Sequence, residues 1–233
     1  MVCHPRDLLR SRTPTLQAWL RHRHMGSSAG TLTNRRGSSS RRVASRPTGA
    51  QNARVRLDRL PTWTKKKLLH VVVEAPRGSP LKMKYEPDLE AITWGHPLPP
   101  GLEYPYDWGF VPSTLADDGD PLDALVVSEV PSHPGVVIPC RPFAVLQLEQ
   151  KDGKGSWERN DRLVVVPEKG GWTNDLRDPD GLPKMMREGL EHFFLSTSFF
   201  SHDTARCLGW KSSKAAIRLV NKSERRFQKK GGA

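Results

Sequence analysis

The sequence has little cysteine and no long hydrophobic run. Its three cysteines, Cys3, Cys140 and Cys207, are too few and too widely spaced for a disulfide framework or a zinc site. No apolar stretch approaches the roughly 18 residues that a membrane-spanning helix requires. These absences exclude small disulfide-stabilised folds and helical membrane proteins, and they fit a reducing compartment.

The first 70 residues almost lack acidic side chains. They contain sixteen Lys or Arg but only Asp7 and Asp58, a net charge of +14. Residues 71–233 carry twenty-one Lys or Arg against twenty-three Asp or Glu, a net charge of −2. The charge of +12 for the whole chain therefore comes from the first 70 residues, and it says nothing about the partners of the remainder.

Residues 1–60 are rich in Arg, Ser, Thr and Gly, a composition typical of disorder. Three interpretations stay open for them. They are an organellar transit peptide with an amphipathic piece around Leu16–Leu20, an arm that binds nucleic acid, or an uninformative tail with an alternative start at Met25. We expect residues 1–67 to form a basic disordered tail and linker, and residues 68–233 to form one folded domain.

One dense acidic run, Asp117-Asp118-Gly119-Asp120-Pro121-Leu122-Asp123, lies within the second part of the chain. Its four carboxylates repel one another unless a cation lies between them. Gly119 and Pro121 predict a turn, and the apolar residues 124–127 that follow predict a buried strand. Carboxylate oxygens mounted on such a turn suit Mg²⁺, Mn²⁺ or Ca²⁺ and not Zn²⁺.

Two plainer interpretations apply to the acidic run. A lone Asp-Gly-Asp is often only a solvated loop. In a calcium EF-hand loop that began at Asp118, Leu122 and Asp123 would stand at the fifth and sixth positions, where a ligand and a glycine belong. This mismatch excludes the EF-hand, and only the sequence around the run argues against the solvated loop.

Short strands followed by two late helices are predicted around this run. Pro139 and Pro142 restrict the longest strand to an edge or a bulge, and the Pro- and Gly-rich residues 94–101 predict an ordered loop. Asp180 is a candidate cap for the first helix. This order predicts an α+β, mainly β fold, in which two C-terminal helices pack against a small β-barrel. The strands are predicted at 68–74, 82–86, 124–127, 136–150 and 162–166, and the helices at 183–195 and 212–229.

Several segments of the chain form a pattern together, although each is weak alone. They are Val71–Glu74 with Lys84–Glu86, Tyr104–Phe110, the acidic run, Pro139–Pro142, Asn160–Leu163 and Leu208–Trp210. In this order and spacing, over about two thirds of the chain, they resemble the soluble inorganic pyrophosphatases of the first family. The resemblance implies a five-stranded barrel of OB type and hydrolysis of inorganic diphosphate.

The resemblance also implies roles for individual residues. Asp118 and Asp123 match ligands of two Mg²⁺ ions, with Asp123 bridging them, and Asp120 matches a general base on the ligand side. Lys84 and Tyr104 match residues that hold phosphate oxygens. Bound divalent ions would neutralise the substrate and lower the pKa of water, because diphosphate repels an attacking hydroxide. We therefore expect Mg²⁺ as the cofactor, with Mn²⁺ as an alternative.

Further positions match less directly. Glu74 and Glu86 match acids that orient metal-bound waters, and Arg162 stands where the family carries a lysine. Asp161 is the best candidate for an additional metal ligand in the hairpin before Arg162. The alternatives for ligands in that hairpin are Asn160, Glu149 and Asp152.

Other positions depart from the family's pattern. An arginine that holds substrate falls on His96, a tyrosine falls on Trp108, and a tyrosine-lysine pair falls on Thr197 and Ser198. The part of the site that generates the nucleophile is thus complete, whereas the part that holds the leaving phosphate has lost cationic and hydroxyl groups. This difference leaves open a bulkier phosphoanhydride as substrate.

A third interpretation is a non-catalytic nucleic-acid binder, since barrels of this type bind oligonucleotides elsewhere. The slightly negative charge of residues 71–233 argues against it, because a nucleic-acid barrel carries basic residues on its folded part. We expect an enzyme that assembles with itself, acts on inorganic diphosphate and does not enter a membrane. Its expected location is the cytoplasm, with an organelle as the alternative if the basic segment is a transit peptide.

Overall fold

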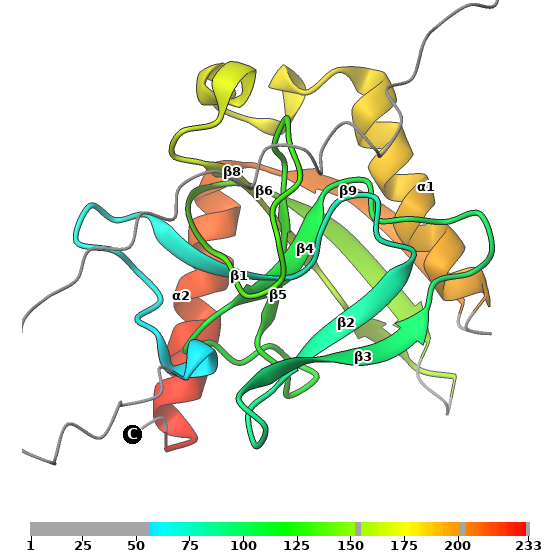
Figure 1. Cartoon of the computed structure of the whole chain (residues 1–233). Coiled ribbons are helices and arrows are strands. Elements are labelled where there is room, and N and C mark those ends of the chain that lie inside the picture. The colour runs from blue at the N-terminus through cyan, green and yellow to red at the C-terminus, as the bar shows by residue number, and fades with distance from the viewer. Residues whose placement is uncertain (1–55, 152–154, 201–203, 232–233) are drawn as a thin grey trace, which may run out of the picture. The chain divides into compact units, whose positions relative to one another are not determined.

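The computed structural model describes residues 56–151, 155–200 and 204–231 (Figure 1). Five of its strands pair edge to edge, and β6 also pairs with β1, so that they close into a ring. The neighbours are antiparallel except for β5 and β8, which are parallel. In ring order the strands are β1 (Leu69–Ala75), β4 (Asp107–Val111), β5 (Leu122–Val126), β8 (Arg162–Pro167) and β6 (Val137–Lys151).

The long strand β6 is central to the sheet and not at its edge. It pairs with β1 and β8, and beyond the ring with β7 (Trp157–Arg159) and β9 (Ala205–Lys211). Of the two placements predicted for this strand, an edge or a bulge, the bulge is confirmed at Pro142. The register against β8 shifts between Pro142 and Ala144, as the alternative prediction of a bulge requires.

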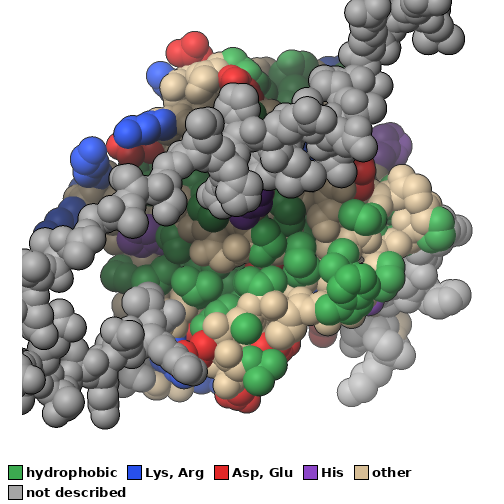
Figure 2. All heavy atoms as spheres, viewed as in Figure 1, with side chains coloured by type: hydrophobic (Ala, Val, Ile, Leu, Met, Phe, Trp, Pro, Cys, Tyr) green, Lys and Arg blue, Asp and Glu red, His purple; other side chains and the backbone are tan. Residues whose placement is uncertain are grey.

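A separate hairpin is formed by β2 (Leu81–Glu86) and β3 (Ala91–Pro97). The loop predicted at 94–101 is thus partly strand. Gly95 explains the difference, because a Cβ atom there would lie 2.6 Å from the carbonyl oxygen of Lys82, and only glycine permits this close pairing. Hydrophobic side chains cover much of the face shown in Figure 2, and Leu89 and Trp94 of this hairpin are exposed.

Two helices cover the sheet, as predicted. Helix α1 (Lys184–Phe200) packs on β9, and helix α2 (Ser213–Lys229) packs mainly on β6. Asp180 does not cap α1, since it lies in a short 3₁₀ turn, Pro179–Gly181, and its carboxylate accepts a hydrogen bond from Arg187. The mainly β fold class with two C-terminal helices is confirmed, and the ring is consistent with an OB-type topology. Two further 3₁₀ turns lie at Leu57–Arg59 and Gly171–Asp175.

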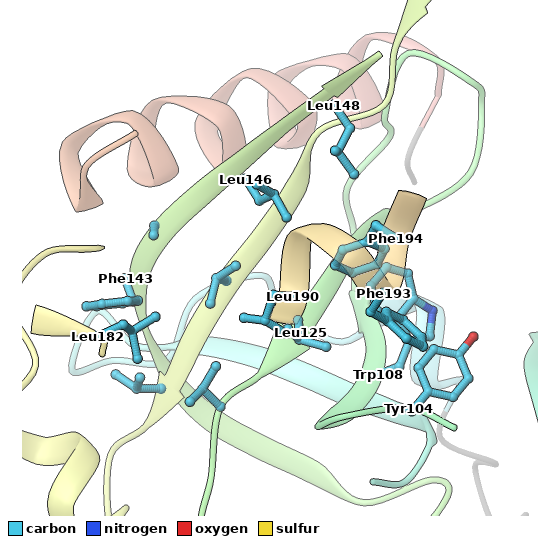
Figure 3. Close-up of a cluster of buried hydrophobic side chains, with 14 of the residues drawn as sticks. Tyr104, Trp108, Leu125, Phe143, Leu146, Leu148, Leu182, Leu190, Phe193 and Phe194 are labelled. Atoms are coloured by element: carbon cyan, nitrogen blue, oxygen red, sulfur yellow. The ribbon is translucent and has the colours of Figure 1, made fainter. Parts of the chain in front are cut away.

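The strands of the ring are buried on both faces, which fixes where each side chain points. In β5, Leu122 and Ala124 belong to the cluster that α2 covers, whereas Leu125 belongs to the cluster that α1 covers. Figure 3 shows the second cluster, in which Phe193 and Phe194 of α1 meet the barrel side chains. Because side chains alternate along a strand, Asp123 lies on the same face of β5 as Leu125.

The folded unit begins before Leu68. Thr62 is buried, and its hydroxyl donates a hydrogen bond to the carbonyl of Pro112 at 3.1 Å. Leu57 and Leu60 pack near Phe110, so residues 56–67 are not a free linker as expected. Residues 1–55 of the tail and linker predicted at 1–67 lie outside the described residues, and for them the expectation stays a prediction. Among the helices that the structure describes, none has the length and apolar character needed to cross a membrane.

Candidate active site

The acidic run forms a tight turn that leads into β5. Gly119 adopts a φ of 93°, a conformation that glycine enters without strain. The carboxylate of Asp118 accepts a hydrogen bond from the backbone N–H of Asp120 at 3.1 Å. Asp118 and Asp120 are therefore presented in the turn, and Asp123 projects from the strand on the face away from α2.

The turn borders a cavity of about 1070 Å³, which we call the carboxylate cleft. The β2–β3 hairpin, the ring strands and α1 all contribute to its lining. All but one of the predicted site residues reach it. Those that line it are Glu74, Lys84, Glu86, Tyr104, Asp118, Asp120, Asp123 and Arg162.

Two carboxylates of the cleft are paired with side-chain cations. The Nζ atom of Lys84 lies 3.1 Å from both carboxylate oxygens of Asp120, and both side chains are about half exposed. Arg162 forms a closer ion pair with Asp123, whose side chains are only 15 % and 30 % exposed. Burial raises the pKa of Asp123, and the Arg162 guanidinium acts against that rise. The partly buried pair is therefore held more firmly than the exposed one.

Aromatic rings hold Arg162 in place. Its guanidinium carbon lies 5.4 Å from the centre of the Trp108 ring and 5.6 Å from that of Phe194. Its Nε atom is buried and has no hydrogen-bond partner in the described part of the chain. An unpaired buried donor is costly, so an oxyanion that reached this nitrogen would gain a strong hydrogen bond.

Burial shifts the ionisation of two further cleft residues. Burial raises the pKa of Glu74 to about 7, although the N–H of Tyr85, donated to its carboxylate at 2.7 Å, acts in the opposite direction. The pKa of Tyr104 is also raised by burial, so its hydroxyl stays protonated and can donate a hydrogen bond. The Tyr104 ring stacks against Trp108, and Figure 3 shows its hydroxyl pointing away from the aromatic cluster.

Asp161 is the predicted site residue that does not line the cleft. Its carboxylate accepts hydrogen bonds from Arg159 at 2.7 Å and from the backbone N–H of Leu148 at 3.3 Å. Its neighbour Asn160 does reach the cleft, where its amide donates to the Oε1 atom of Gln150 at 2.8 Å. The hairpin thus presents neutral amides to the cleft, and its alternative ligand Asp152 lies outside the described residues.

The cleft includes a cation that sequence analysis did not assign. Lys82 lines it next to Lys84, with Met83 between them on β2. Residues at positions i and i+2 of a strand lie on the same face, so the predicted strand at 82–86 already placed Lys82 beside Lys84. The four departures from the family's pattern also line the cleft, so they alter this site and not a distant surface. They are His96, Trp108, Thr197 and Ser198.

The remaining carboxylate of the acidic run faces elsewhere. Asp117 pairs with Lys222 at 3.5 Å and with Arg226, both on α2. It ties the turn to the helix and does not line the cleft.

Comparisons with known proteins agree on one family. A family model for inorganic pyrophosphatase matches residues 71–228. The inorganic pyrophosphatase of Synechocystis sp. is 33% identical over 172 residues, which cover 74% of this chain and 99% of the relative. That of Thermus thermophilus is 35% identical over 164 residues, which cover 69% of this chain and 91% of the relative.

Solved structures give the same result. The crystal structure of the Thermus thermophilus inorganic pyrophosphatase matches with a TM-score of 0.68 and 35% identity, covering 75% of this chain and 99% of that one. The inorganic pyrophosphatase from Helicobacter pylori matches with a TM-score of 0.66 and 27% identity, covering 72% and 98%. The matches span almost the whole of these relatives and include the carboxylate cleft. The chain belongs to the inorganic pyrophosphatase family.

Proposed function

We propose that this chain hydrolyses inorganic diphosphate to two orthophosphates in the carboxylate cleft, with Mg²⁺ as cofactor and Mn²⁺ as a substitute. The observation that carries the proposal is the convergence of Asp118, Asp120 and Asp123 with Lys84 and Arg162 on one cavity of a pyrophosphatase fold. Carboxylates and fixed cations together suit the cleavage of a highly charged anhydride.

The donor chemistry of the cleft fits a divalent metal. Asp118, Asp120 and Asp123 offer the hard oxygens that Mg²⁺ prefers, and Asp118 is not taken up by a side-chain cation in the described residues. Over the same residues, no three His, Cys, Asp or Glu side chains gather closely enough to hold an ion by themselves. We assign Asp118 and Asp123 as ligands with Asp120 beside them. A bound ion would supply charge neutralisation and a lowered pKa of water.

The side chains have distinct parts in the reaction. Asp120, which is exposed in the acidic turn, accepts the proton of the attacking water. The bond between one phosphorus and the bridging oxygen breaks as the water oxygen bonds to that phosphorus, and the bridging oxygen leaves with the second phosphate. Arg162, with its spare Nε donor, and the hydroxyl of Tyr104 hold phosphoryl oxygens as negative charge develops.

The remaining residues of the cleft position water and substrate. Glu74 and Glu86 line the cleft and would accept hydrogen bonds from waters around a bound ion. Lys82 and Lys84 add positive charge from the β2–β3 hairpin. Asp161, which is bound by Arg159, lines a second, smaller cavity together with Asp118 and Asp123, so it stays a candidate metal ligand.

A bulkier phosphoanhydride is the second candidate substrate. The cleft, at about 1070 Å³, lies at the upper end of ordinary ligand pockets, which span about 300–1,000 Å³. His96 and Ser198 line it where larger or cationic groups are expected in the family. Release of phosphate from diphosphate, tripolyphosphate and ATP, with and without Mg²⁺, compares the two candidates. Faster turnover of ATP or tripolyphosphate than of diphosphate would favour the second.

Two neighbouring aspartates test the assignment of the site. We expect Asp118→Asn to lower the rate of diphosphate hydrolysis by at least about 100-fold, because an amide is a poorer ligand for Mg²⁺ than a carboxylate. Asp117→Asn is the matched control, since Asp117 pairs with α2 outside the cleft, and we expect it to change the rate less than about threefold. Equal rates for the two variants would contradict the assignment.

Assembly of the chain with itself and its location in the cytoplasm stay predictions. The basic residues 1–55, on which the alternative of an organelle depends, lie outside the described part of the structure. The membership of the family supports an enzyme and removes the nucleic-acid binder from consideration.

A further inference from the structure

The net charge of the side chains that line the carboxylate cleft limits how many metal ions the cleft can hold. Among the described residues, the lining contains six carboxylates, from Asp58, Glu74, Glu86, Asp118, Asp120 and Asp123, and three cations, from Lys82, Lys84 and Arg162. With no substrate bound, the excess is three negative charges when every carboxyl is ionised. Two divalent ions bring four positive charges and already exceed it. More than two ions would therefore repel one another without phosphate to separate them.

Two of the carboxylates also carry a cation already. Arg162 is paired with Asp123 deep in the cleft, and Lys84 is centred on both oxygens of Asp120. An arginine cannot be deprotonated at any ordinary pH, so a metal ion at Asp123 must either displace it or bind beside it. The rings of Trp108 and Phe194 hold the guanidinium over this site and oppose its displacement.

On the far side of the cleft, the described residues of the hairpin between β6 and β8 supply no further carboxylate to its lining. Glu149 is bound by Arg206 at 2.8 Å, and Asp161 is bound by Arg159 at 2.7 Å. The residues that face the cleft from this side are the paired amides of Gln150 and Asn160. Amide oxygens are neutral and hold a divalent ion more weakly than carboxylates do.

We propose that Arg162 and Lys84 are resident cations, which take the place of divalent ions at the carboxylates of the cleft. The inference rests on the proposed function, since it concerns the same metal ligands. When diphosphate enters, Lys84 exchanges the exposed Asp120 for a phosphoryl oxygen and frees that carboxylate for the reaction.

Arg162 should oppose metal binding more strongly than Lys84 does. Arg162 is largely buried and fixed between rings, so its charge acts on Asp123 through a medium that screens it weakly. Lys84 and Asp120 are about half exposed, so water weakens their interaction. Removal of Arg162 must therefore improve metal binding more than removal of Lys84.

The test measures metal binding without substrate. Mn²⁺ is titrated into the full chain by calorimetry and by electron paramagnetic resonance, and the melting temperature is measured in EDTA and in excess Mg²⁺. We expect Arg162→Met to bind Mn²⁺ at least about tenfold more tightly or to bind an additional ion. Its melting temperature in EDTA should be lower than that of the parent, because Asp123 is left unpaired. Excess Mg²⁺ should raise its melting temperature more than it raises that of the parent. For Lys84→Met we expect an increase in affinity of about threefold.

Two ion-paired residues outside the cleft serve as matched controls. Arg206 pairs with Glu149, and its guanidinium carbon lies 4.1 Å from the Trp157 ring centre. Arg206→Met therefore removes a guanidinium that is also paired with a carboxylate and packed on a ring, but in a more exposed place than Arg162. Lys184, which is exposed and paired with Glu188, is the control for Lys84. We expect neither control to change the affinity for Mn²⁺. Unchanged or weaker Mn²⁺ binding in both Arg162→Met and Lys84→Met would overturn the proposal.

Hydrolysis by the parent chain separates this proposal from the function on which it rests. If the parent hydrolyses diphosphate but the two variants bind Mn²⁺ as the controls do, the proposal of resident cations is wrong and the proposed function stands. If the variants bind Mn²⁺ more tightly while the parent cleaves neither diphosphate nor tripolyphosphate nor ATP, the proposal of resident cations stands and the proposed function is wrong. Lys84 lies on an exposed strand, so this variant keeps the test valid even if Arg162→Met does not fold.

Discussion

At the scale of single residues, the cleft is defined by charges taken partly out of water. Glu74 is almost fully buried at the end of β1, and Arg162 and Asp123 are largely buried beside it. Burying an ionised group costs free energy unless a partner offsets it. Asp123 has Arg162 as a partner, whereas the carboxylate of Glu74 receives a neutral backbone N–H from Tyr85. The folded chain therefore favours the protonated form of Glu74.

Glu74 should give the metal-free protein a pH-dependent stability. Its pKa in the folded chain is raised from 4.5 to about 7, mainly by burial, so the folded state holds a proton that the unfolded state releases. This contribution to stability is complete below about pH 4.5 and is lost as the pH rises through about 7. For Glu74→Gln, which keeps the acceptor for Tyr85, we expect the loss between pH 5 and pH 8 to shrink by about 1–3 kcal/mol.

Urea unfolding in EDTA across that range measures the effect. Glu103→Gln is the control, because Glu103 is exposed and its loss should leave the pH profile of stability unchanged. A profile for Glu74→Gln that follows the parent at every pH would show that Glu74 ionises freely in the folded chain.

At the scale of elements, the pairing of β1 with β4 places the site. Val73 lies opposite Gly109 in this pairing, and the register shifts between Val73 and Ala75, next to Glu74. A Cβ atom on Gly109 would come within 1.9 Å of the carbonyl oxygen of Val72. The ring closes at this place only because one strand carries no side chain there. Glu74 lies at this register shift, so the same close approach positions it in the cleft.

Two glycine-to-alanine changes test this close approach. Gly109→Ala should separate β1 from β4 and destabilise the protein by about 3 kcal/mol or more, as overpacking in a core does. Gly189→Ala in α1 has no atom within 4 Å of the added Cβ and should stabilise the protein by about 0.5–1 kcal/mol, because alanine favours helix. Thermal and urea unfolding of the two variants provide the comparison, and equal melting temperatures would contradict the role of Gly109.

At the scale of the whole molecule, residues 56–67 complete the folded unit. The backbone N–H of Leu57 donates to the hydroxyl of Tyr85 at 3.3 Å, and the hydroxyl of Ser113 donates to the carbonyl of Leu60 at 2.9 Å. Arg59 lies 5.2 Å from the ring centre of Phe227 on α2. This segment therefore connects β2, β4 and α2, which are far apart in the sequence.

Two truncations separate this segment from the basic residues before it. A chain that begins at Gln51 should keep its rate of diphosphate hydrolysis within about twofold, because every assigned site residue lies beyond it. A chain that begins at Leu68 should lose about 2–4 kcal/mol of stability, since it lacks the contacts of Leu57, Leu60 and Thr62. Melting temperature and activity of the two chains provide the measurement. A large loss of activity on removal of residues 1–50 alone would show that they act in catalysis.

Most of the fold class was predictable because local signals and burial agree. Valine-rich strands such as residues 69–75 and 162–167 are buried on both faces, and such strands read as continuous apolar runs. The start of α1 and the strand at Ala91–Pro97 were not predictable in the same way. There a 3₁₀ turn and the pairing of β3 with β2 outweigh the local preferences of Asp180 and of the prolines.

The sequence by itself determined the chemistry that this chain can carry. A carboxylate run on a glycine turn needs a cation nearby, whatever the rest of the fold, and the segments around the run are those of a pyrophosphatase. Only the tertiary structure decided which charges meet. Lys84 faces Asp120 across 36 positions, and Arg162 faces Asp123 across 39, while Asp161 turns to Arg159. Such pairings depend on strand register and on the packing of α1, and neither is encoded in the spacing of the residues themselves.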